Sequence, residues 1–213
     1  MFVKVCCIAD IGEARLAISA GASAIGLVSA MPSGPGPIAE EAIAEIAAAV
    51  PRPTETFLLT ALVEAEAIAD QQRRCRTTAV QLVDAVEDAE LRRLRRLLPD
   101  VRLVQVIHVA GPESVDEARA AAPLVDTILL DSGNPLLAVK ELGGTGRVHD
   151  WTTSRRICET VAVPVLLAGG LNPGNAREAL ERVRPAGLDV CSGLRPNGRL
   201  DAARLRAFFE SIH

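Results

Sequence analysis

The feature that most restricts the fold is an alternation, repeated eight times, of short apolar runs with longer segments of helical period. Runs rich in Val, Ile and Leu predict buried strands, and the Ala-, Glu- and Arg-rich segments between them predict helices. The predicted strands cover 2–8, 23–29, 55–60, 78–83, 101–108, 126–131, 163–168 and 187–191. The predicted helices cover 11–20, 38–49, 63–74, 87–98, 113–121, 151–161, 173–183 and 201–212.

Eight successive strand–helix units favour a closed (β/α)₈ barrel with parallel strands, formed by residues 1–213 as a single domain. The alternative is an open doubly wound sheet, which would need no eighth unit. The composition suits either fold, because 49% of the residues are apolar and only 2% are aromatic. Aliphatic side chains must therefore fill the core, as they do in parallel sheets that are buried on both faces.

Charge and hydropathy exclude several classes of function. The net charge is −4, and the basic run at 92–96 lies beside acidic residues on a predicted helix, so we expect no nucleic-acid partner. An apolar run of about 18 residues does not occur, so no membrane span is predicted. The N-terminus also lacks the order of segments that defines a secretory signal.

Five cysteines, an odd number, stand without metal-ligand spacing at positions 6, 7, 75, 158 and 191. A disulfide between the adjacent Cys6 and Cys7 would strain the backbone. His108 and His149 lack a partnered carboxylate motif, and we expect them to be ordinary hydrogen-bonded side chains. The sequence therefore predicts a reduced, cytoplasmic protein with no metal and no cofactor.

In a (β/α)₈ barrel the chemistry lies where the strands end, at the carboxyl-terminal face. In "FVKVCCI" the period of two puts Phe2, Lys4, Cys6 and Ile8 on one face of the first strand. Cys6 then shares the interior with Lys4, whose positive charge favours a reactive thiolate. The alternative is that Cys6 is an unreactive residue that only packs in the core. Cys7 is predicted to point outward as inert packing.

Asp131 ends the apolar strand "DTILLD", and the same period brings it to the barrel interior if Thr127 and Leu129 point inward. Partial burial would raise its pKa and suit it to act as a general acid. An Asx turn that closes the strand is the alternative explanation, and Asp131 alone does not decide between the two.

Two glycine turns follow the seventh and eighth strands. "LLAGGLNPGN" contains Gly169, Gly170 and Asn172, and we expect it to open a helix at Asn172; "DVCSGLRPNG" contains Ser192 and Gly193. Backbone N–H groups at glycine turns and helix N-termini bind phosphate, and barrels use these two loops for it repeatedly. Each turn alone is ordinary turn chemistry, but the pair favours a phosphate site.

In their order along the chain, these stretches resemble the phosphoribosylanthranilate isomerase family. That family has "VKICGI", "GADAIGFVF", "VQLHG", "LLD", "GGTGKTFDW", "LAGGLNPENV" and "VDVSSGVE". The corresponding stretches here are "VKVCCI", "GASAIGLVS", "VQLVD", "LLD", "GGTGRVHDW", "LAGGLNPGNA" and "LDVCSGLR". The match spans nearly the whole chain, and the combination of the first-strand cysteine with "GGTG…DW" and "LAGGLNP" is specific.

The resemblance implies a (β/α)₈ barrel that isomerises a phosphoribosylamine to a 1-amino-ketose, an Amadori rearrangement. It makes Cys6 the general base at ribose C2 and Asp131 the general acid at the ring oxygen. It also assigns the substrate phosphate to Gly143, Gly144, Gly169, Gly170, Ser192 and Gly193. The expected partner is thus a small phosphosugar, and both a monomer and a homodimer remain open.

Several positions depart from the family pattern. Gly36 stands where "SPRYI" carries the arginine that grips the anthranilate carboxylate, and Cys7 replaces the glycine after the catalytic cysteine. Arg195 replaces a glutamate and is a candidate for a substrate contact. Lys4, which shares the barrel interior with Cys6, is a second candidate. Two alternatives therefore stay beside phosphoribosylanthranilate isomerisation. One is the same reaction on another aglycone, and the other is a catalytically silent phosphate-binding barrel.

Overall fold

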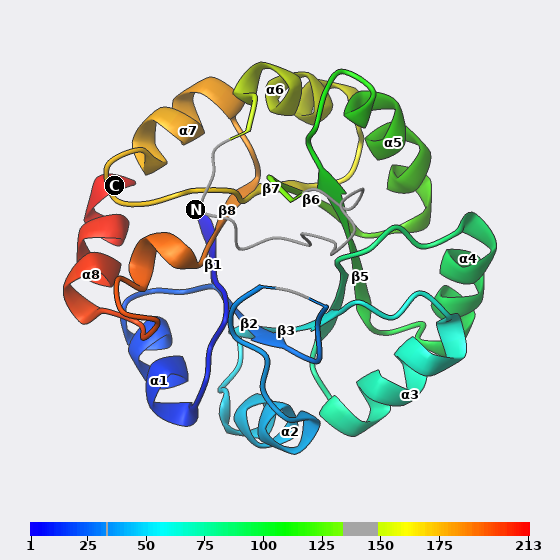
Figure 1. Cartoon of the computed structure of the whole chain (residues 1–213), viewed down its shortest axis with the longest axis horizontal. Helices are drawn as coiled ribbons and strands as arrows, with labels where there is room; N and C mark the ends of the chain where they lie inside the picture. Colours follow the sequence, from blue (N-terminus) through cyan, green and yellow to red (C-terminus); the bar gives the residue numbers. More distant parts are fainter. Residues whose placement is uncertain (33, 134–148) are drawn as a thin grey trace.

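A computed structural model describes residues 1–32, 34–133 and 149–213 of the chain. Its eight parallel strands form a closed barrel in chain order, from β1 round to β8 and back to β1 (Figure 1). The strands are β1 (Phe2–Val5), β2 (Ala24–Val28), β3 (Glu55–Thr60), β4 (Ala79–Leu82), β5 (Arg102–His108), β6 (Thr127–Asp131), β7 (Val165–Leu167) and β8 (Gly187–Val190). The predicted barrel is confirmed, and the open sheet is excluded.

A helix follows each strand and packs outside the barrel, as the ring in Figure 1 shows. The helices are α1 (Ile11–Ser19), α2 (Glu40–Ala49), α3 (Ala65–Cys75), α4 (Asp88–Leu97), α5 (Ser114–Ala121), α6 (Trp151–Thr160), α7 (Ala176–Val183) and α8 (Ala202–Ser211). Two short 3₁₀ helices, η1 (Ala122–Leu124) and η2 (Ser192–Leu194), follow α5 and β8. Every predicted element is present, and most ends agree within two residues.

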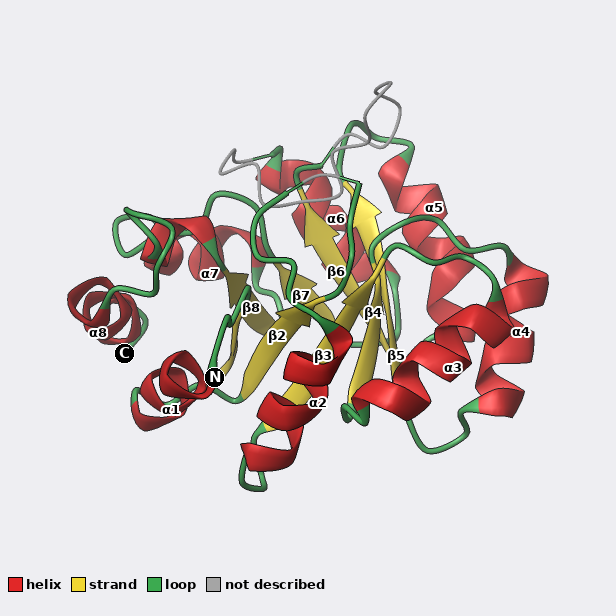
Figure 2. Cartoon of the chain, turned by 60° about the horizontal axis from the view of Figure 1, so that its bottom comes forward, coloured by secondary structure: helices red, strands yellow, loops and turns green. Residues whose placement is uncertain are grey.

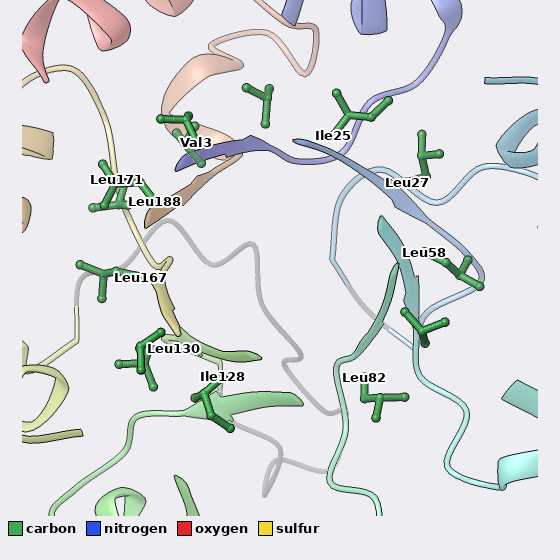
Figure 3. Packing of buried hydrophobic residues seen from close by; sticks show 14 of the residues in the cluster. Val3, Ile25, Leu27, Leu58, Leu82, Ile128, Leu130, Leu167, Leu171 and Leu188 are labelled. Carbon is green, nitrogen blue, oxygen red and sulfur yellow. The ribbon is translucent and has the colours of Figure 1, made fainter. Parts of the chain in front are cut away.

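The core has two layers because alternate residues of each strand point to opposite sides. The outer layer lies between strands and helices and consists mainly of aliphatic side chains, among them Val3, Ile25 and Leu130 (Figure 3). The inner layer fills the barrel and includes Ala24, Phe57, Leu129 and the two cysteines Cys6 and Cys7. Aliphatic residues dominate both layers, as the scarcity of aromatic residues predicts.

The carboxyl ends of all the strands meet at one end of the barrel, at the tips of the arrows in Figure 2. We call this end the mouth. Residues that directly follow different strands, and that lie far apart in the sequence, are therefore neighbours there. No helix in the described ranges is long and apolar enough to cross a membrane.

The start of α1 agrees with the prediction from the sequence, and the start of α7 differs from it. Asp10 caps α1, because its side chain accepts a hydrogen bond from the backbone N–H of Glu13. The helix predicted to open at Asn172 begins instead at Ala176. Asn172 forms a turn, in which its side-chain oxygen accepts from the N–H of Gly174 at 2.8 Å. The Asx turn holds the chain at Asn172 and delays the helix.

Candidate functional site

Cys6 lies in the barrel interior at the mouth, directly after β1. Its backbone N–H donates to the carbonyl of Val190 at 2.8 Å, so β8 holds it in place. Its side chain is 5% exposed and faces Gly26 on β2, where a Cβ atom would come within 2.7 Å of the sulfur. The prediction that Cys6 points into the barrel is confirmed, and the glycine opposite leaves room for its thiol.

Lys4 precedes Cys6 by two residues and lies on the same face of the chain, deeper in the barrel. It forms a buried ion pair with Asp189 of β8. The ammonium nitrogen is 2.9 Å from Asp189 Oδ2, with side-chain exposures of 0% and 7%. Burial by itself would lower the pKa of Lys4, but the charges of Asp189 and Cys6 outweigh burial and raise it. Lys4 is thus a charged residue that acts on Cys6 from below. Its side chain is fully buried, and the substrate contact expected of it stays a prediction.

The ionisation of Cys6 depends on two opposing influences. A hydrogen bond with Cys7, followed by burial, raises the pKa of Cys6 well above its ordinary value, while the charge of Lys4 lowers it. Lys4 therefore favours the thiolate, as expected, but Cys7 and the apolar surroundings prevail. The protonated thiol of Cys6 is therefore favoured in this structure.

Cys7 does not point outward, and that prediction is wrong. Its backbone adopts the left-handed conformation (φ 60°), which breaks the alternation of side chains after Cys6. Cys7 consequently joins the inner layer, while Ile8 joins the outer layer. The sulfur of Cys7 lies 2.7 Å from that of Cys191, which follows β8. Strand periodicity could not reveal this, because β1 ends three residues earlier than predicted.

Asp131 ends β6 on the inner face, since Leu129 belongs to the inner layer and Leu130 to the outer one. One carboxylate oxygen accepts a hydrogen bond from the N–H of Ser132 at 2.7 Å. Burial raises the pKa of Asp131 despite this hydrogen bond. Asp131 therefore closes its strand and also holds a proton more readily than an ordinary aspartate, as a general acid requires.

His108 stands beside Asp131, because the two residues pair in the register of β5 and β6. Its Nε2 lies 2.9 Å from the carbonyl oxygen of Val83, which can only accept, so Nε2 carries a hydrogen. The other ring nitrogen, Nδ1, is buried and has no hydrogen-bond partner in the described structure. The sequence treated His108 as an ordinary strand-end residue, and only the strand register shows that it neighbours the candidate acid.

The two glycine turns predicted to bind phosphate meet at the mouth. Gly169 and Gly170 adopt positive φ values of 84° and 63°, which favour glycine. A Cβ atom on Gly193 would come within 2.0 Å of the carbonyl oxygen of Leu171. The turn after β8 can therefore approach the turn after β7 this closely only with glycine at position 193. Asn172 braces the first turn by donating to the carbonyl of Gly170 at 3.1 Å.

Ser192 begins η2 beside Gly193, as the second turn requires. Gly143 and Gly144, the remaining predicted phosphate-binding residues, lie outside the described residues. In the parts of the chain that are described, no group of three or more His, Cys, Asp or Glu side chains could hold a metal ion.

Arg195 forms a buried ion pair rather than an open contact at the mouth. Its two terminal nitrogens lie 3.1 and 2.8 Å from the two carboxylate oxygens of Glu13. One of these nitrogens also donates to the carbonyl of Cys6 at 3.2 Å. Glu13 in turn accepts from the N–H groups of Ala9 and Leu200. The pair joins the first turn of α1 to the loop after β8, and Arg195 fixes the backbone of Cys6.

Arg195 thus positions the backbone of Cys6 while Glu13 binds its charge, and the substrate contact expected of Arg195 stays a prediction. Hydrogen bonds from Arg195, Leu200 and Ala9 overcome the effect of burial and lower the pKa of Glu13, which stays ionised. The sequence did not reveal Glu13 or Asp189 as partners. The sequence contained a signal for Asp189, which is a lone charge within an apolar strand. Because the eighth strand of a closed barrel lies beside the first, this charge could have been paired with Lys4.

His149 stands where the family pattern has phenylalanine, and it is largely buried. Its Nε2 lies 2.8 Å from the hydroxyl of Ser154, while Nδ1 is buried with no hydrogen-bond partner in the described structure. Burial lowers the pKa of His149 from 6.5 to about 4, against a smaller opposing effect of Asp150. The imidazole is thus neutral over the physiological range.

Separating Arg195 from Glu13 should destabilise the fold. Arg195→Leu leaves a buried carboxylate and Glu13→Gln a buried guanidinium, so we expect each to lower the free energy of unfolding by about 3 kcal/mol. The double variant should lose less than the sum. Urea unfolding measures all three. Arg119→Leu, which breaks the exposed pair with Asp116, is the control and should cost about 0.5 kcal/mol or less; equal losses would contradict the bracing role.

His149 should make the fold sensitive to acid. Because its pKa is lower in the folded state than in the unfolded chain, the unfolded chain binds more protons as the pH falls from 6.5 towards 4. The native protein should therefore lose stability across this window, by on the order of 2 kcal/mol more than a His149→Phe variant. Urea unfolding at several pH values tests this, and parallel curves for the two proteins would contradict it.

The arrangement of Cys6, Asp131 and the glycine turns is accompanied by extensive similarity to known proteins. The model of the N-(5'-phosphoribosyl)anthranilate (PRA) isomerase family matches residues 3–211. The N-(5'-phosphoribosyl)anthranilate isomerase of Methanocella arvoryzae is 34% identical, over 99% of this chain and 97% of that protein. Isomerase 2 of Methanosarcina mazei is 35% identical, over 98% and 92%.

A solved structure supports the same assignment. The crystal structure of phosphoribosyl anthranilate isomerase from Thermotoga maritima superposes with a TM-score of 0.86 at 26% identity, covering 100% of this chain and 98% of that one. With a family match over nearly its whole length, the chain belongs to the phosphoribosylanthranilate isomerase family.

Proposed function

We propose that this protein is a phosphoribosylanthranilate isomerase of tryptophan biosynthesis that works in the cytoplasm, with Cys6 as its general base and Asp131 as its general acid. The observation that carries the proposal is the pairing of a thiol and a proton-holding carboxyl group on the inner face of one barrel mouth. Family membership gives the reaction class, and the raised pKa of Asp131 supports its role.

The reaction begins at the ring oxygen of the phosphoribosylamine. Asp131, whose raised pKa favours the protonated form, donates its proton to that oxygen, and the C1–O bond breaks to leave an iminium ion. The iminium makes the hydrogen on C2 acidic, and the thiolate of Cys6 removes it. The resulting enolamine becomes the 1-amino-ketose by tautomerisation. A proton thus leaves C2 while another reaches the ring oxygen, with no external oxidant or reductant.

The glycine turns would hold the phosphate at the other end of the substrate. Main-chain N–H groups near Gly169, Gly170, Asn172, Ser192 and Gly193 can donate to phosphate oxygens without a basic side chain. The close contact of Gly193 with Leu171 supports this role, because it brings the two turns together. Gly143 and Gly144 belong to the same proposed site by their resemblance to the family pattern.

Removing either proposed catalytic group should abolish most of the activity. We expect Cys6→Ser and Asp131→Asn each to lower kcat by about 10²–10⁴-fold, because each removes a positioned proton donor or acceptor. Loss of fluorescence of freshly prepared phosphoribosylanthranilate measures the rate. Cys158→Ser, on the outer helix α6, is the control and should keep full activity. Full activity of Cys6→Ser would exclude the proposed base.

A second candidate, the same rearrangement on an aglycone without a carboxylate, is favoured by Gly36. A Cβ atom on Gly36 would come within 2.8 Å of Cys7 Cβ, and Gly36 has a φ of 89°. Cys7 therefore excludes the arginine that the family pattern carries there. Arg195 cannot replace it without giving up Glu13.

The coupling of Gly36 with Cys7 predicts how substrate choice will respond to mutation. Gly36→Arg alone should not improve the KM for phosphoribosylanthranilate, because its Cβ would collide with Cys7. Cys7→Gly/Gly36→Arg should lower that KM about tenfold by supplying a charged hydrogen bond to the carboxylate. Phosphoribosylaniline, which lacks the carboxylate, is the control substrate and should not respond. An equal effect of the single and double variants would contradict the coupling.

A further inference from the structure

Cys7 and Cys191 bring two thiols together at the seam where the barrel closes. Val5 of β1 pairs with Val190 of β8, and Cys6 continues this pairing through its hydrogen bond to Val190. Cys191 directly follows β8, and Cys7 lies two residues beyond the end of β1; the two strands run side by side in Figure 1. In the register that pairs Val5 with Val190, Cys191 stands beside Cys6, and Cys7 lies one residue further along the chain. The positions of the two sulfur atoms therefore decide whether a bridge can form.

The side chains are also directed towards each other. The left-handed backbone of Cys7 turns its sulfur to within 2.7 Å of that of Cys191, where Cys191 donates a hydrogen bond. On its other side, Cys7 is packed against Gly36, and its thiol lies 3.6 Å from the carbonyl oxygen of Pro35. In the family pattern quoted above these two positions hold glycine and serine. This chain therefore has a thiol at both partners of one contact.

We propose that Cys7 and Cys191 form a reversible disulfide, which makes the β1–β8 seam a redox-sensitive modification site next to Cys6. A small approach of the two sulfurs reaches the S–S bond length of about 2.05 Å. Both thiols are free in this structure, which represents the reduced form. The proposal concerns the pair and does not depend on the isomerase reaction.

Disulfide exchange with oxidised glutathione, a small disulfide, accounts for every atom and electron. Cys191, which is partly exposed, loses its thiol proton to solvent and attacks one glutathione sulfur, and a glutathione thiolate leaves. Cys7 then loses its proton and attacks the sulfur of Cys191, and the second glutathione leaves. Two protein thiols are oxidised to one disulfide, and one oxidised glutathione is reduced to two thiols.

The order of the two steps follows from the contacts. The hydrogen bond with Cys191 is the largest cause that raises the pKa of Cys7, so Cys7 is a poor first nucleophile. Once Cys191 has joined glutathione, that hydrogen bond is lost and Cys7 gives up its proton more readily. The half-buried Cys191 thus reacts first and the buried Cys7 resolves the mixed disulfide.

The bond would form next to Cys6 and change its reactivity, because Cys6 and Cys7 are consecutive residues that both lie in the inner layer. The hydrogen bond with Cys7 is the largest cause of the raised pKa of Cys6, and the sulfur of a disulfide no longer offers the same partner. Lys4 remains in place to stabilise the thiolate. Oxidation of the pair should therefore lower the pKa of Cys6, whereas reduction should restore it.

The test treats the whole purified protein with oxidised glutathione and maps its peptides without reduction. We expect a cross-linked pair of peptides that contain Cys7 and Cys191, a loss of two hydrogen masses, and full reversal by dithiothreitol. Cys191→Ser should give no such pair and should instead leave the other cysteines reduced. A mixed disulfide that persists on Cys191, or a bridge that involves Cys6, would overturn the proposal.

Labelling of Cys6 by iodoacetamide supplies a second measurement that needs no substrate. In the oxidised protein the pH midpoint of labelling at Cys6 should fall by about one unit relative to the reduced protein, which is about tenfold faster labelling below the midpoint. Cys191→Ser should show no change after the same treatment. An unchanged or higher midpoint in cross-linked protein would disprove the coupling to Cys6. Neither peptide mapping nor labelling measures turnover. Loss of the proposed isomerase activity can therefore be distinguished from failure of the proposed disulfide.

Discussion

The buried ion pair between Lys4 and Asp189 crosses the seam at which β8 closes on β1, and the surroundings of Cys6 depend on it. Two opposite charges without solvent are tolerated there because they are 2.9 Å apart. The pair lies below Cys6, and the positive charge of Lys4 favours the thiolate of Cys6. Asp131 is also affected by both members of the pair, which links the candidate base and acid through one buried interaction.

Around that pair, the seam concentrates most of the unusual residues of this chain. The pair of Arg195 and Glu13 holds the loop after β8 to the first turn of α1, and Arg195 also donates to the carbonyl of Cys6. Cys7 and Cys191 meet directly above, and Gly36 fits against Cys7 because it has no side chain. The side chain at one of these positions limits the size of the side chain at its neighbour. A single substitution that restores the family residue is therefore not expected to restore the family's contacts. The departures from the family pattern are therefore better understood as one coupled set than as separate losses.

Sequence periodicity predicted much of the site as well as the barrel. Alternation in "FVKVCCI" placed Cys6 inside with Lys4, and "DTILLD" placed Asp131 on the inner face; the structure agrees in both cases. Periodicity failed at Cys7, because a left-handed residue ends the strand early and reverses which side chain points inward. It also misplaced the start of α7, because the Asx turn at Asn172 precedes the helix. Both errors arise from local backbone geometry that side-chain polarity does not encode.

The sequence by itself determined the number and order of the strand–helix units, the aliphatic core and the identity of the two candidate catalytic groups. The units and the core follow from local patterns of polarity, which depend on residues close together in the chain, whereas the resemblance to the family supplied the roles of Cys6 and Asp131. Only the tertiary structure decided which distant residues share a contact: Lys4 with Asp189, Glu13 with Arg195, Cys7 with Cys191, and His108 with Asp131. Barrel closure sets these pairs, and closure joins the first strand to the last across the whole length of the chain.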